Sequence, residues 1–592
     1  MPIGSYSKIK ENDMDYIKTY SQWLNNVSGI EEKELLAIKN DENEIKERFA
    51  IPLAFGTAGM RGIVGMGTFR MNVYTVARAT AGLAEFICTL GEDAKKRGVV
   101  ISYDTRRFSY EFAKKVACVL SSYGINSYLF DNVHPVPMCS YAIRYYKAIA
   151  GVMITASHNP KEYNGYKVYG EDGAQMSPED TAVVVDYINK IDDYFSVKCD
   201  DVFFPDSILG IDEQNINDYI TIIGKTVDES YYNEILKLSL SPEAVANFGK
   251  NLKLVYTPIH GSGYVPVSTI LAKLGINVSI VEEQAKYDTE FSTVPIPNPE
   301  NPEALKLGIK LGDEIGADVV IGTDPDCDRM GIAVRDDEGT FRLLNGNQIG
   351  ALLLDYIITR LKESNSMPSN PAIVKTIVTT TLADRIAKSN GVTVFNVLTG
   401  FKFIGEKIKE WERNGEYNFL FGYEESYGYL RGTHARDKDA VVASMLASEM
   451  VCYYESIGKK LYQRLNELFA EYGYYREAVT SIAYKGISAM EDMANAMSKI
   501  RAKTISTIAG EKVLATSDYK VGTTVYSDGT VEKITLPKTD ALKYQLEDEQ
   551  FVCIRPSGTE PKLKLYVLCY SDSADSAMQK AERLLEGIKS EL

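Results

Sequence analysis

The feature that most constrains this chain is a rhythm of short apolar segments, each ending in a polar loop and followed by a helical pattern. VVISYD ends at Asp104, AIAGVMIT leads into ASHNP, and ADVVIGT leads into DPDCDR. LKLVYTPIHGSG and NFLFGYEES repeat this order. Strands alternating with helices predict an α/β layered fold. Ligands of open α/β sheets gather at the carboxyl ends of strands, so the polar loops are candidate functional sites, although any large α/β protein shows this rhythm.

The length predicts several domains. The chain has 592 residues, whereas one core rarely grows past roughly 250–300 residues. A polar stretch at 192–212 and a turn-like stretch at 336–339 are soft candidate boundaries. A last block begins near Ser456 with helices and ends with a strand, the loop RPSGTEP, a second strand and a final helix. Residues 1–50 have a charged helical pattern, in which Trp23 is a candidate docking side chain.

Charge and cysteine content exclude some classes of partner. The formal net charge of −16 disfavours nucleic acid and anionic membranes, because both reward a basic surface. No run approaches the roughly 20 apolar residues of a membrane span, and no secretory signal is evident. The eight cysteines are scattered without a C-x-x-C pair, as expected for reduced thiols. We therefore expect a cytoplasmic protein that binds neither nucleic acid nor membrane.

The segment TASHNP contains a candidate nucleophile. Ser157 follows a buried apolar strand, where a hydroxyl can be exposed on a fixed backbone. Serine is a weak nucleophile unless a base or a metal assists it. His158 lies beside it, and Lys167 in the following NGYK could transfer protons if its neighbours lowered its pKa. The alternative is a polar turn in which Asn-Pro acts as a stop signal.

The segment GTDPDCDRMG contains a candidate metal site. Asp324, Asp326 and Asp328 alternate after an apolar strand, a spacing that lets three carboxylates converge on one point. Converging carboxylates repel one another, and Mg²⁺ is a hard cation that prefers oxygen ligands. The pattern disfavours an EF-hand, because no Gly occupies the sixth loop position and no Glu the twelfth. Arg329 adds a guanidinium that could bind phosphate. The alternative is a solvated acidic turn.

The segment GYEESYGYLRG offers groups for a polar ligand. Glu424 and Ser426 are two residues apart and could accept hydrogen bonds from adjacent sugar hydroxyls. HARDKD follows and offers Arg436 and Lys438 as cations, while TGFK places Lys402 on a loop before a helix. A surface turn explains the glutamate segment equally well.

The segment RPSGTEPK has the composition of an anion-binding loop. An arginine fork, two hydroxyls and a glycine that permits close backbone approach occur together. These residues are Arg555, Ser557, Gly558 and Thr559. The segment lacks the pattern of a Walker A loop, and a Pro/Gly turn between strands is the alternative. Arg61, in GTAGMRG near a helix start, marks a second candidate anion site.

Together these loops resemble the α-D-phosphohexomutase superfamily. TASHNP resembles its phosphoserine loop, DPDCDR its metal loop, GYEES its sugar-binding loop and RPSGTEPK its phosphate-binding loop. They occur in the family's order and span nearly the whole chain. FGTAGMRG, NGYKVY and TGFK look most like the phosphoglucomutase-2 and phosphopentomutase branch. Tyr423 before Glu424, and Cys327 where Ala or Gly is common, are departures that leave the sugar preference open.

The resemblance implies four domains around a central cleft. Three are related α/β domains with mixed sheets, and the fourth is a smaller C-terminal α+β domain. We expect residues 1–206 to hold an N-terminal helical extension and the phosphoserine loop, and residues 207–338 to hold the metal loop. Residues 339–457 would then hold the sugar loop, and residues 458–592 the phosphate-binding loop.

The resemblance also implies roles for individual residues. Ser157 would carry the phosphoryl group, and Lys167 would transfer protons. Mg²⁺ would be bound by Asp324, Asp326, Asp328 and an oxygen of phosphorylated Ser157. Residues around the transferring phosphoryl group would be Arg61, His158 and Arg329. The substrate's own phosphate would bind Arg555, Ser557, Gly558 and Thr559, and its ring hydroxyls would bind Glu424 and Ser426. Some family members have histidine where this chain has Phe401 and Lys402, so Lys402 is a candidate second phosphate or proton-transfer contact.

The implied activity interconverts glucose 1-phosphate and glucose 6-phosphate through phosphoserine and a glucose 1,6-bisphosphate intermediate, which also serves as activator. Mannose or pentose phosphates of the same class remain open as substrates, and so does a monomeric or dimeric state. A metal-dependent sugar phosphatase is an alternative from another class. A non-catalytic sugar-phosphate binder is a third, but such a protein need not keep Ser157, Lys167 and the three aspartates.

Overall fold

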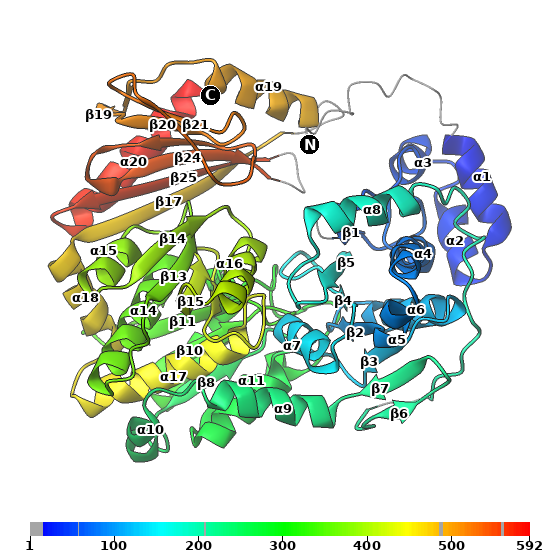
Figure 1. Cartoon of the computed structure of the whole chain (residues 1–592), viewed down its shortest axis with the longest axis horizontal. Coiled ribbons are helices and arrows are strands. Elements are labelled where there is room, and N and C mark those ends of the chain that lie inside the picture. Colours follow the sequence, from blue (N-terminus) through cyan, green and yellow to red (C-terminus); the bar gives the residue numbers. More distant parts are fainter. Residues whose placement is uncertain (1–15, 57–58, 206–208, 485–488, 558–561) are drawn as a thin grey trace.

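The computed structural model describes residues 16–592 except for 57–58, 206–208, 485–488 and 558–561. Four large sheets follow one another along the chain, each with its own helices (Figure 1). The first domain lies beside the second and third, and the fourth packs against the third (Figure 1). The predicted α/β class, with three related domains and a separate C-terminal domain, is confirmed.

Three short helices precede the first sheet and pack against the first domain around a small hydrophobic core that also includes Met66. Trp23 is 1% exposed and meets the rings of Phe49 and Tyr74 edge-on. Asp41 begins the third helix by accepting a hydrogen bond from the backbone N–H of Glu44 at 3.1 Å. The predicted docking role of Trp23 is therefore correct. The helices are α1 (Tyr16–Asn26), α2 (Ile30–Ala37) and α3 (Glu42–Phe49).

The first domain has a seven-stranded sheet in the order β1-β5-β4-β2-β3-β7-β6. Its strands are β1 (Gly59–Ile63), β2 (Val99–Tyr103), β3 (Ser127–Phe130), β4 (Ala150–Ile154), β5 (Tyr163–Gly170), β6 (Gln214–Asn215) and β7 (Ile220–Ile223). Its helices are α4 (Val73–Thr89), α5 (Glu92–Arg97), α6 (Ser109–Ser122), α7 (Val136–Tyr146) and α8 (Pro178–Ile188). Because β7 pairs in parallel with β3, this sheet extends to Ile223, beyond the boundary that we expected at residue 206.

The second domain has a five-stranded sheet in the order β12-β11-β10-β8-β9. Its strands are β8 (Leu254–Thr257), β9 (Val278–Ile280), β10 (Val319–Thr323), β11 (Met330–Arg335) and β12 (Phe341–Leu344). Its helices are α9 (Lys225–Leu236), α10 (Pro242–Phe248), α11 (Tyr264–Leu274), α12 (Glu282–Ala285) and α13 (Pro302–Ile315). All five residues of β10 are buried, as the continuous apolar run predicted.

The third domain has a four-stranded sheet in the order β14-β13-β15-β16. Its strands are β13 (Pro371–Thr376), β14 (Thr393–Val397), β15 (Asn418–Glu424) and β16 (Gly428–Leu430). The helices are α14 (Gly346–Glu363), α15 (Leu382–Ser389), α16 (Lys402–Asn414), α17 (Ala440–Ser456) and α18 (Leu461–Tyr472). Helix α18 lies beyond the boundary expected at residue 457, yet its Arg464 binds Asp355 of α14 at 2.7 Å.

The fourth domain has a seven-stranded antiparallel sheet in the order β17-β25-β24-β23-β20-β21-β22. Its strands are β17 (Tyr474–Ala483), β20 (Ala515–Asp518), β21 (Thr523–Tyr526), β22 (Val531–Lys533), β23 (Leu542–Gln545), β24 (Phe551–Pro556) and β25 (Lys562–Ser571). A small hairpin joins β18 (Thr507–Ile508) and β19 (Glu511–Lys512), and the helices are α19 (Ala489–Arg501), η2 (Glu547–Glu549) and α20 (Ala574–Glu591).

The three α/β domains share one local arrangement at the predicted loops. In each, a strand pairs in parallel with one neighbour and then turns back into an antiparallel partner. TASHNP connects β4 to β5, DPDCDR connects β10 to β11, and the end of GYEES connects β15 to β16. Each predicted loop is therefore the turn of a hairpin at the carboxyl end of a parallel strand.

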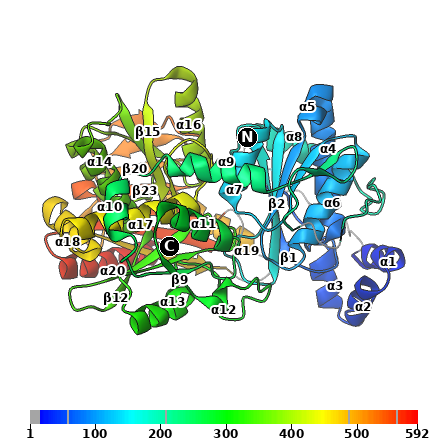
Figure 2. The same cartoon turned by 90° about the horizontal axis from the view of Figure 1, so that it is seen from below.

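Helix contacts join the domains. Seen from below, α7 and α9 lie between the first sheet and the second and third domains (Figure 2). Glu449 of α17 is buried and accepts hydrogen bonds from the backbone N–H groups of Leu240 at 2.9 Å and Ser241 at 2.7 Å. These N–H groups lie at the start of α10, where the helix dipole favours a carboxylate. Glu449 therefore binds the third domain to the second.

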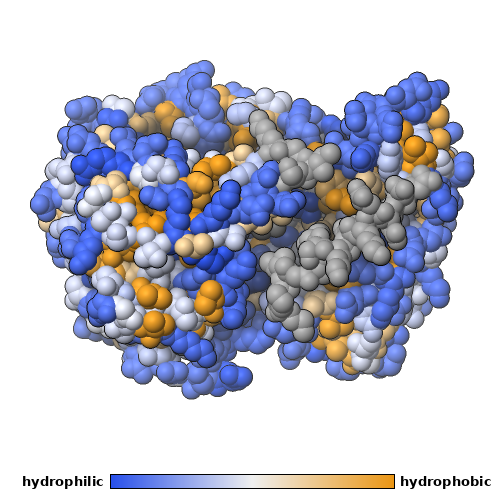
Figure 3. Space-filling view, turned by 90° about the horizontal axis from the view of Figure 1, so that it is seen from above, coloured by the Kyte–Doolittle hydropathy of each residue, from blue (hydrophilic) through white to orange (hydrophobic). Residues whose placement is uncertain are grey.

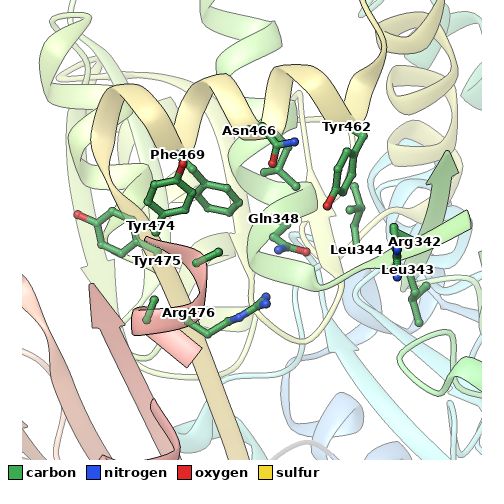
Figure 4. A pocket seen from close by; sticks show the side chains of 13 residues that line it. Arg342, Leu343, Leu344, Gln348, Tyr462, Asn466, Phe469, Tyr474, Tyr475 and Arg476 are labelled. Carbon is green, nitrogen blue, oxygen red and sulfur yellow. The ribbon is translucent and has the colours of Figure 1, made fainter. Parts of the chain in front are cut away.

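The fourth domain is joined to the third by a single residue between α18 and β17. Gly473 has φ 102°, and the ring of Tyr570 would lie 1.7 Å from any Cβ at this position. Beside this connection is a cavity of about 310 Å³. Its walls come from β12, α14, α18, β17 and α20, and include Gln348, Tyr462 and Arg476 (Figure 4). The packing between the two domains is therefore incomplete here.

The surface seen from above is mostly hydrophilic, with hydrophobic side chains dispersed among charged and polar ones (Figure 3). None of the helices in the part of the chain that the structure describes has the length and apolar character to cross a bilayer.

Candidate active site

The candidate nucleophile lies on a constrained turn after β4. Ser157 has φ 52°, in the left-handed region, and is 4% exposed. Its backbone N–H donates to Thr155 Oγ1 at 2.8 Å. Its hydroxyl donates to Asp324 Oδ2 at 3.0 Å and lies 3.1 Å from His158 Nδ1. The predicted meeting of the serine loop and the aspartate loop is therefore present in the structure.

Arg106, which the sequence analysis missed, holds this turn in place. Its guanidinium donates to the backbone carbonyls of Pro160 and Tyr163, both at 2.9 Å. It also donates to the carbonyls of Ser157 and Asn159. Four carbonyls of one loop thus bind a single buried side chain that lies just beyond the end of β2.

Asp104 stabilises the same loop through contacts with Thr155 and Arg106. Its Oδ2 accepts a hydrogen bond from Thr155 Oγ1 at 2.6 Å and lies 3.4 Å from Arg106 Nε. Its Oδ1 accepts from the backbone N–H of Arg106 at 2.9 Å. The apolar run VVISYD had indicated a strand that ends at Asp104, so position at a strand's carboxyl end was the available signal for both residues.

The three predicted metal ligands converge. Asp324, Asp326 and Asp328 are almost fully buried, and each offers one carboxylate oxygen within 4.8 Å of the others. Asp326 Oδ1 and Asp328 Oδ1 have no hydrogen-bond partner among the described residues. Buried carboxylates at this spacing are costly unless a cation compensates them. The donor set is all oxygen, which suits Mg²⁺.

The electrostatics of the cluster agree with that fit. Burial, followed by the charges of Asp326 and Asp328, raises the pKa of Asp324 well above its ordinary value. Burial raises the pKa of Asp326, but Lys167, a hydrogen bond with Asp324 and the charge of Lys438 together outweigh it, so the net pKa is lowered. One carboxyl of the group thus disfavours ionisation beside its neighbours, a conflict that a divalent cation would remove.

Two lysines border the aspartates. Lys167 Nζ lies 2.8 Å from Asp326 Oδ2 and 3.6 Å from Asp328 Oδ2. Lys438 Nζ lies 3.1 Å from Asp328 Oδ2 and 3.1 Å from Asp437 Oδ1. Burial lowers the pKa of both lysines, but the carboxylates outweigh it, so both pKa values are raised and both side chains are cationic at neutral pH.

The other residues predicted around the phosphoryl group are Arg61 on β1, His158 on the serine loop and Arg329 on the aspartate loop. Arg61 Nη1 donates to Asn159 Oδ1 at 2.8 Å, next to the serine turn. Arg329 binds Glu300 at 2.5 Å and reaches Asp328 at 3.9 Å. Burial, then the charges of Arg329 and Arg61, lowers the pKa of His158 well below its ordinary value. His158 is therefore neutral beside the serine hydroxyl.

Three of the residues that we expected to bind the sugar lie at the end of β15, in the turn that follows it and at the start of α16. Glu424 is buried at the end of β15, accepts a hydrogen bond from the N–H of Gly400 at 2.8 Å, and has a pKa raised by burial. Ser426 is half-buried in the following turn. Lys402 begins α16, and burial lowers its pKa.

Arg436 is placed differently from the other candidates. Its guanidinium binds Glu412 of α16 and the carbonyls of Thr433 and Ala435. Its backbone N–H donates to Ser140 of the first domain at 2.9 Å. The contacts described for Arg436 thus join the first and third domains and do not include the aspartate cluster, so substrate binding by this residue stays a prediction.

The fourth domain presents cations toward these loops. Arg555 and Lys564 lie opposite each other on β24 and β25. Burial, then the charges of Arg555 and Arg329, lowers the pKa of Lys564, so the three cations are within electrostatic reach of one another. Ser557 donates its backbone N–H to the carbonyl of Lys562 at 2.8 Å. Gly558 and Thr559 lie outside the described residues. Lys564 was not singled out from the sequence, although it belongs to the KLKLY segment.

Comparison with known proteins decides the family. The phosphoglucomutase/phosphomannomutase models match four consecutive stretches: α/β/α domain I at 52–195, domain II at 229–339, domain III at 345–472 and the C-terminal domain at 494–585. The chain belongs to the phosphoglucomutase/phosphomannomutase family. The predicted superfamily is therefore correct.

Curated relatives support the same assignment over nearly the full length. The protein named phosphoglucomutase of Staphylococcus epidermidis is 39% identical over 540 residues, which are 91% of this chain and 94% of that protein. The phosphoglucomutase of Staphylococcus aureus is 36% identical over 545 residues, 92% of this chain and 94% of that protein.

Solved structures show the same fold. A putative phosphomannomutase from Thermus thermophilus matches with a TM-score of 0.65 at 22% identity, over 91% of this chain and 99% of that one. The open form of the phosphoglucomutase parafusin from Paramecium matches with a TM-score of 0.65 at 18% identity, over 92% of this chain and 95% of that one.

Proposed function

We propose that this member of the phosphoglucomutase/phosphomannomutase family is a Mg²⁺-dependent phosphoglucomutase. It would interconvert glucose 1-phosphate and glucose 6-phosphate through phosphorylated Ser157 and a glucose 1,6-bisphosphate intermediate. The observation that carries the proposal is the 3.0 Å hydrogen bond from Ser157 Oγ to Asp324, which joins a constrained hydroxyl to three convergent carboxylates. The names of the staphylococcal relatives supply glucose as the sugar.

The aspartates would hold the metal, with an oxygen of phosphorylated Ser157 as a further ligand. Mg²⁺ at Asp324, Asp326 and Asp328 would supply positive charge to the oxygens of the transferring phosphoryl group. Phosphoryl transfer passes through a loose transition state, so catalysis depends mainly on position and charge. Arg61 on β1, beside the serine turn, and Arg329 on the metal loop would add fixed positive charge.

The transfer exchanges one oxygen–phosphorus bond for another. The bond from phosphorus to Ser157 Oγ breaks while a bond to a free sugar hydroxyl forms. The serine oxygen gains a proton from Lys167, and the proton lost by the sugar hydroxyl restores Lys167, so no proton is gained or lost overall. Lys167 is held cationic by Asp326 and Asp328, so it can give a proton to the departing serine oxygen. Neutral His158, 3.1 Å from that oxygen, can orient it by a hydrogen bond without adding a charge of its own that would attract the negatively charged phosphoryl group.

The remaining residues would orient the sugar. Glu424 would bind the ring hydroxyls together with Ser426, and Arg555, Ser557, Gly558 and Thr559 would bind the phosphate that is not transferred. Lys564, opposite Arg555, adds a cation to that phosphate site. The bisphosphate would then turn between the two phosphate positions, so that either phosphate can return to Ser157.

A turnover assay combined with mass measurement tests the proposal. The purified chain is given glucose 1-phosphate, Mg²⁺ and catalytic glucose 1,6-bisphosphate, and glucose 6-phosphate is measured. Ser157→Ala should lower kcat at least about 10³-fold, whereas Ser21→Ala, at an exposed position, should not. The wild-type Ser157 peptide should carry an added phosphate of about 80 Da.

The outcome also separates the alternatives. Near-normal turnover by Ser157→Ala would refute phosphoserine catalysis, and steady release of inorganic phosphate would indicate a phosphatase. Parallel assays with mannose 1-phosphate and ribose 1-phosphate would identify a different preferred sugar. A cytoplasmic location is part of the proposal, and fractionation of source cells tests it.

A further inference from the structure

Two cysteines meet on the first domain, away from the loops described above. Lys115 and Cys118 are three residues apart on α6 and so share one face of that helix. The segment before β6 runs along this face. The N–H of Asp200 donates to the carbonyl of Cys118 at 3.2 Å, and Ser121 Oγ donates to Asp200 Oδ2 at 2.6 Å. These contacts place Cys199 directly over Lys115 and Cys118.

The two sulfur atoms lie close together in this arrangement. Lys115 Nζ lies 3.5 Å from Cys199 Sγ, and Cys199 Sγ lies 3.7 Å from the carbonyl of Asp200. The Cys118 thiol is close enough to Cys199 for a hydrogen bond between them to be the main influence on the pKa of Cys199. Cys118 is buried and Cys199 is exposed, and both are free thiols. The sulfur of Cys199 is therefore accessible to reagents in solution, while the sulfur of Cys118 lies next to it in the interior.

The environment makes the two thiols unlike. The hydrogen bond from Cys118, helped by the charge of Lys115, lowers the pKa of Cys199 to about 6. The same hydrogen bond and burial raise the pKa of Cys118. Since the thiolate is the reactive form, Cys199 is the attacking sulfur at neutral pH and Cys118 remains a thiol.

We propose that Cys118 and Cys199 form an oxidation site, at which a hydroperoxide converts the two thiols into a reversible disulfide. The Cys199 thiolate attacks one peroxide oxygen, the O–O bond breaks, and a sulfenic acid and hydroxide result. Cys118 sulfur then attacks the sulfenic sulfur and displaces its oxygen, and its proton leaves with that oxygen as water. In sum, two thiols and one hydrogen peroxide give one disulfide and two waters. A thiol reductant reverses the change.

Cys88 provides a matched comparison within the same domain. It is also partly accessible and has a neighbouring lysine, Lys95. Burial nevertheless raises the pKa of Cys88, so it remains a thiol. The proposal therefore predicts that Cys199 reacts and Cys88 does not.

The test is peptide mass mapping of the full chain after treatment with hydrogen peroxide. Fully reduced protein is exposed to an equimolar amount of hydrogen peroxide, blocked with N-ethylmaleimide and digested without reductant. We expect a cross-linked peptide that joins Cys118 to Cys199, with the loss of two hydrogens, and its disappearance after dithiothreitol. In Cys118→Ser, Cys199 should instead be trapped by dimedone as the sulfenic acid. In Cys88→Ser, the cross-link should form as in the wild type.

Two further variants test the origin of the reactivity. Lys115→Met should slow alkylation of Cys199 by iodoacetamide at pH 7 at least threefold, and Lys95→Met should leave it unchanged. The proposal is overturned if Cys199 is oxidised no faster than Cys88, or if no Cys118–Cys199 cross-link forms while Cys199 oxidises. Because the phosphosugar assay plays no part in these readouts, failure here would leave the proposed mutase activity untouched.

Discussion

Replacing Arg106 by lysine tests the claim that one buried guanidinium fixes the serine turn. Arg106 donates to the carbonyls of Ser157, Asn159, Pro160 and Tyr163. A lysine keeps the positive charge beside Asp104, but its single ammonium cannot reproduce the planar fork that reaches four acceptors. At least two buried carbonyls should lose their partner.

The expected cost follows from those lost bonds. Leaving a buried acceptor unpaired costs roughly 1–3 kcal/mol, so with two such acceptors local opening of the turn should become about 2–6 kcal/mol easier. By the relation of tenfold per 1.4 kcal/mol, amide hydrogens within residues 156–164 should exchange at least about 30-fold faster. A displaced nucleophile should also lower kcat by about 10²-fold, because errors near 1 Å have effects of that size.

Arg107→Lys provides the control for this experiment. Arg107 is the next residue in the chain, but it is exposed and pairs with Glu290 at the surface, so the change should have little effect. Hydrogen exchange followed by mass spectrometry, together with the mutase assay, compares the two variants. The reasoning would be refuted if amide hydrogens at 156–164 exchanged equally fast in Arg106→Lys and Arg107→Lys and if Arg106→Lys kept kcat within twofold. The Arg106 guanidinium would then have no role in positioning Ser157.

Three further predictions concern the sugar loop, pH and the domain junction. Glu424→Ala should raise KM for glucose 1-phosphate at least about tenfold, by loss of ligand hydrogen bonds, while half-saturation by Mg²⁺ changes less than threefold. Equal shifts in both would contradict its role. Burial lowers the pKa of His134, but Asp228, 3.0 Å away, the carbonyl of Asn132 and the charge of Asp131 together outweigh it, so the folded-state pKa lies above the ordinary 6.5. This stabilisation is complete below about pH 6.5 and is lost as pH rises through the raised pKa. The denaturation midpoint of the wild type should therefore fall relative to that of His134→Gln between pH 6 and 8, and parallel pH profiles would exclude the linkage. Glu449→Gln should lower the melting temperature by replacing a carboxylate that accepts backbone N–H bonds at α10, whereas Glu455→Gln, nearer the surface on the same helix, should not.

The sequence predicted those parts of the site that depend on local spacing. Three aspartates alternating after an apolar strand converge, because a hairpin turn keeps them on one short loop. Ser157 reaches them because β4, the strand of the first domain that precedes it, ends next to the loop of the second domain that carries the aspartates. The family resemblance supplied that inter-domain meeting, since spacing within one loop contains no information about a residue 167 positions away.

Other contacts could not be predicted for the same reason. Arg106 donates to carbonyls that lie more than 50 residues later in the chain. Because every residue has a backbone carbonyl, no sequence pattern shows which carbonyls bind an arginine. Arg436 follows the sugar loop and looks like a phosphate ligand, yet Glu412 of α16 occupies its guanidinium. The pairing of β7 with the first sheet could not be foreseen, because this four-residue strand follows a polar stretch that is typical of a linker.

The one-residue connection at Gly473 sets how the end of the fourth domain that carries Arg555 and Lys564 can travel. Tyr474 pairs with Ser571 at one end of β25, and Pro556 pairs with Leu563 near the other end of this ten-residue strand. At about 3.3 Å per residue the strand is a lever of roughly 30 Å, so a 10° rotation about the glycine would sweep its far end through about 5 Å. The φ and ψ angles of Gly473, and no flexible linker, would then determine how wide the opening is through which a sugar phosphate enters and leaves.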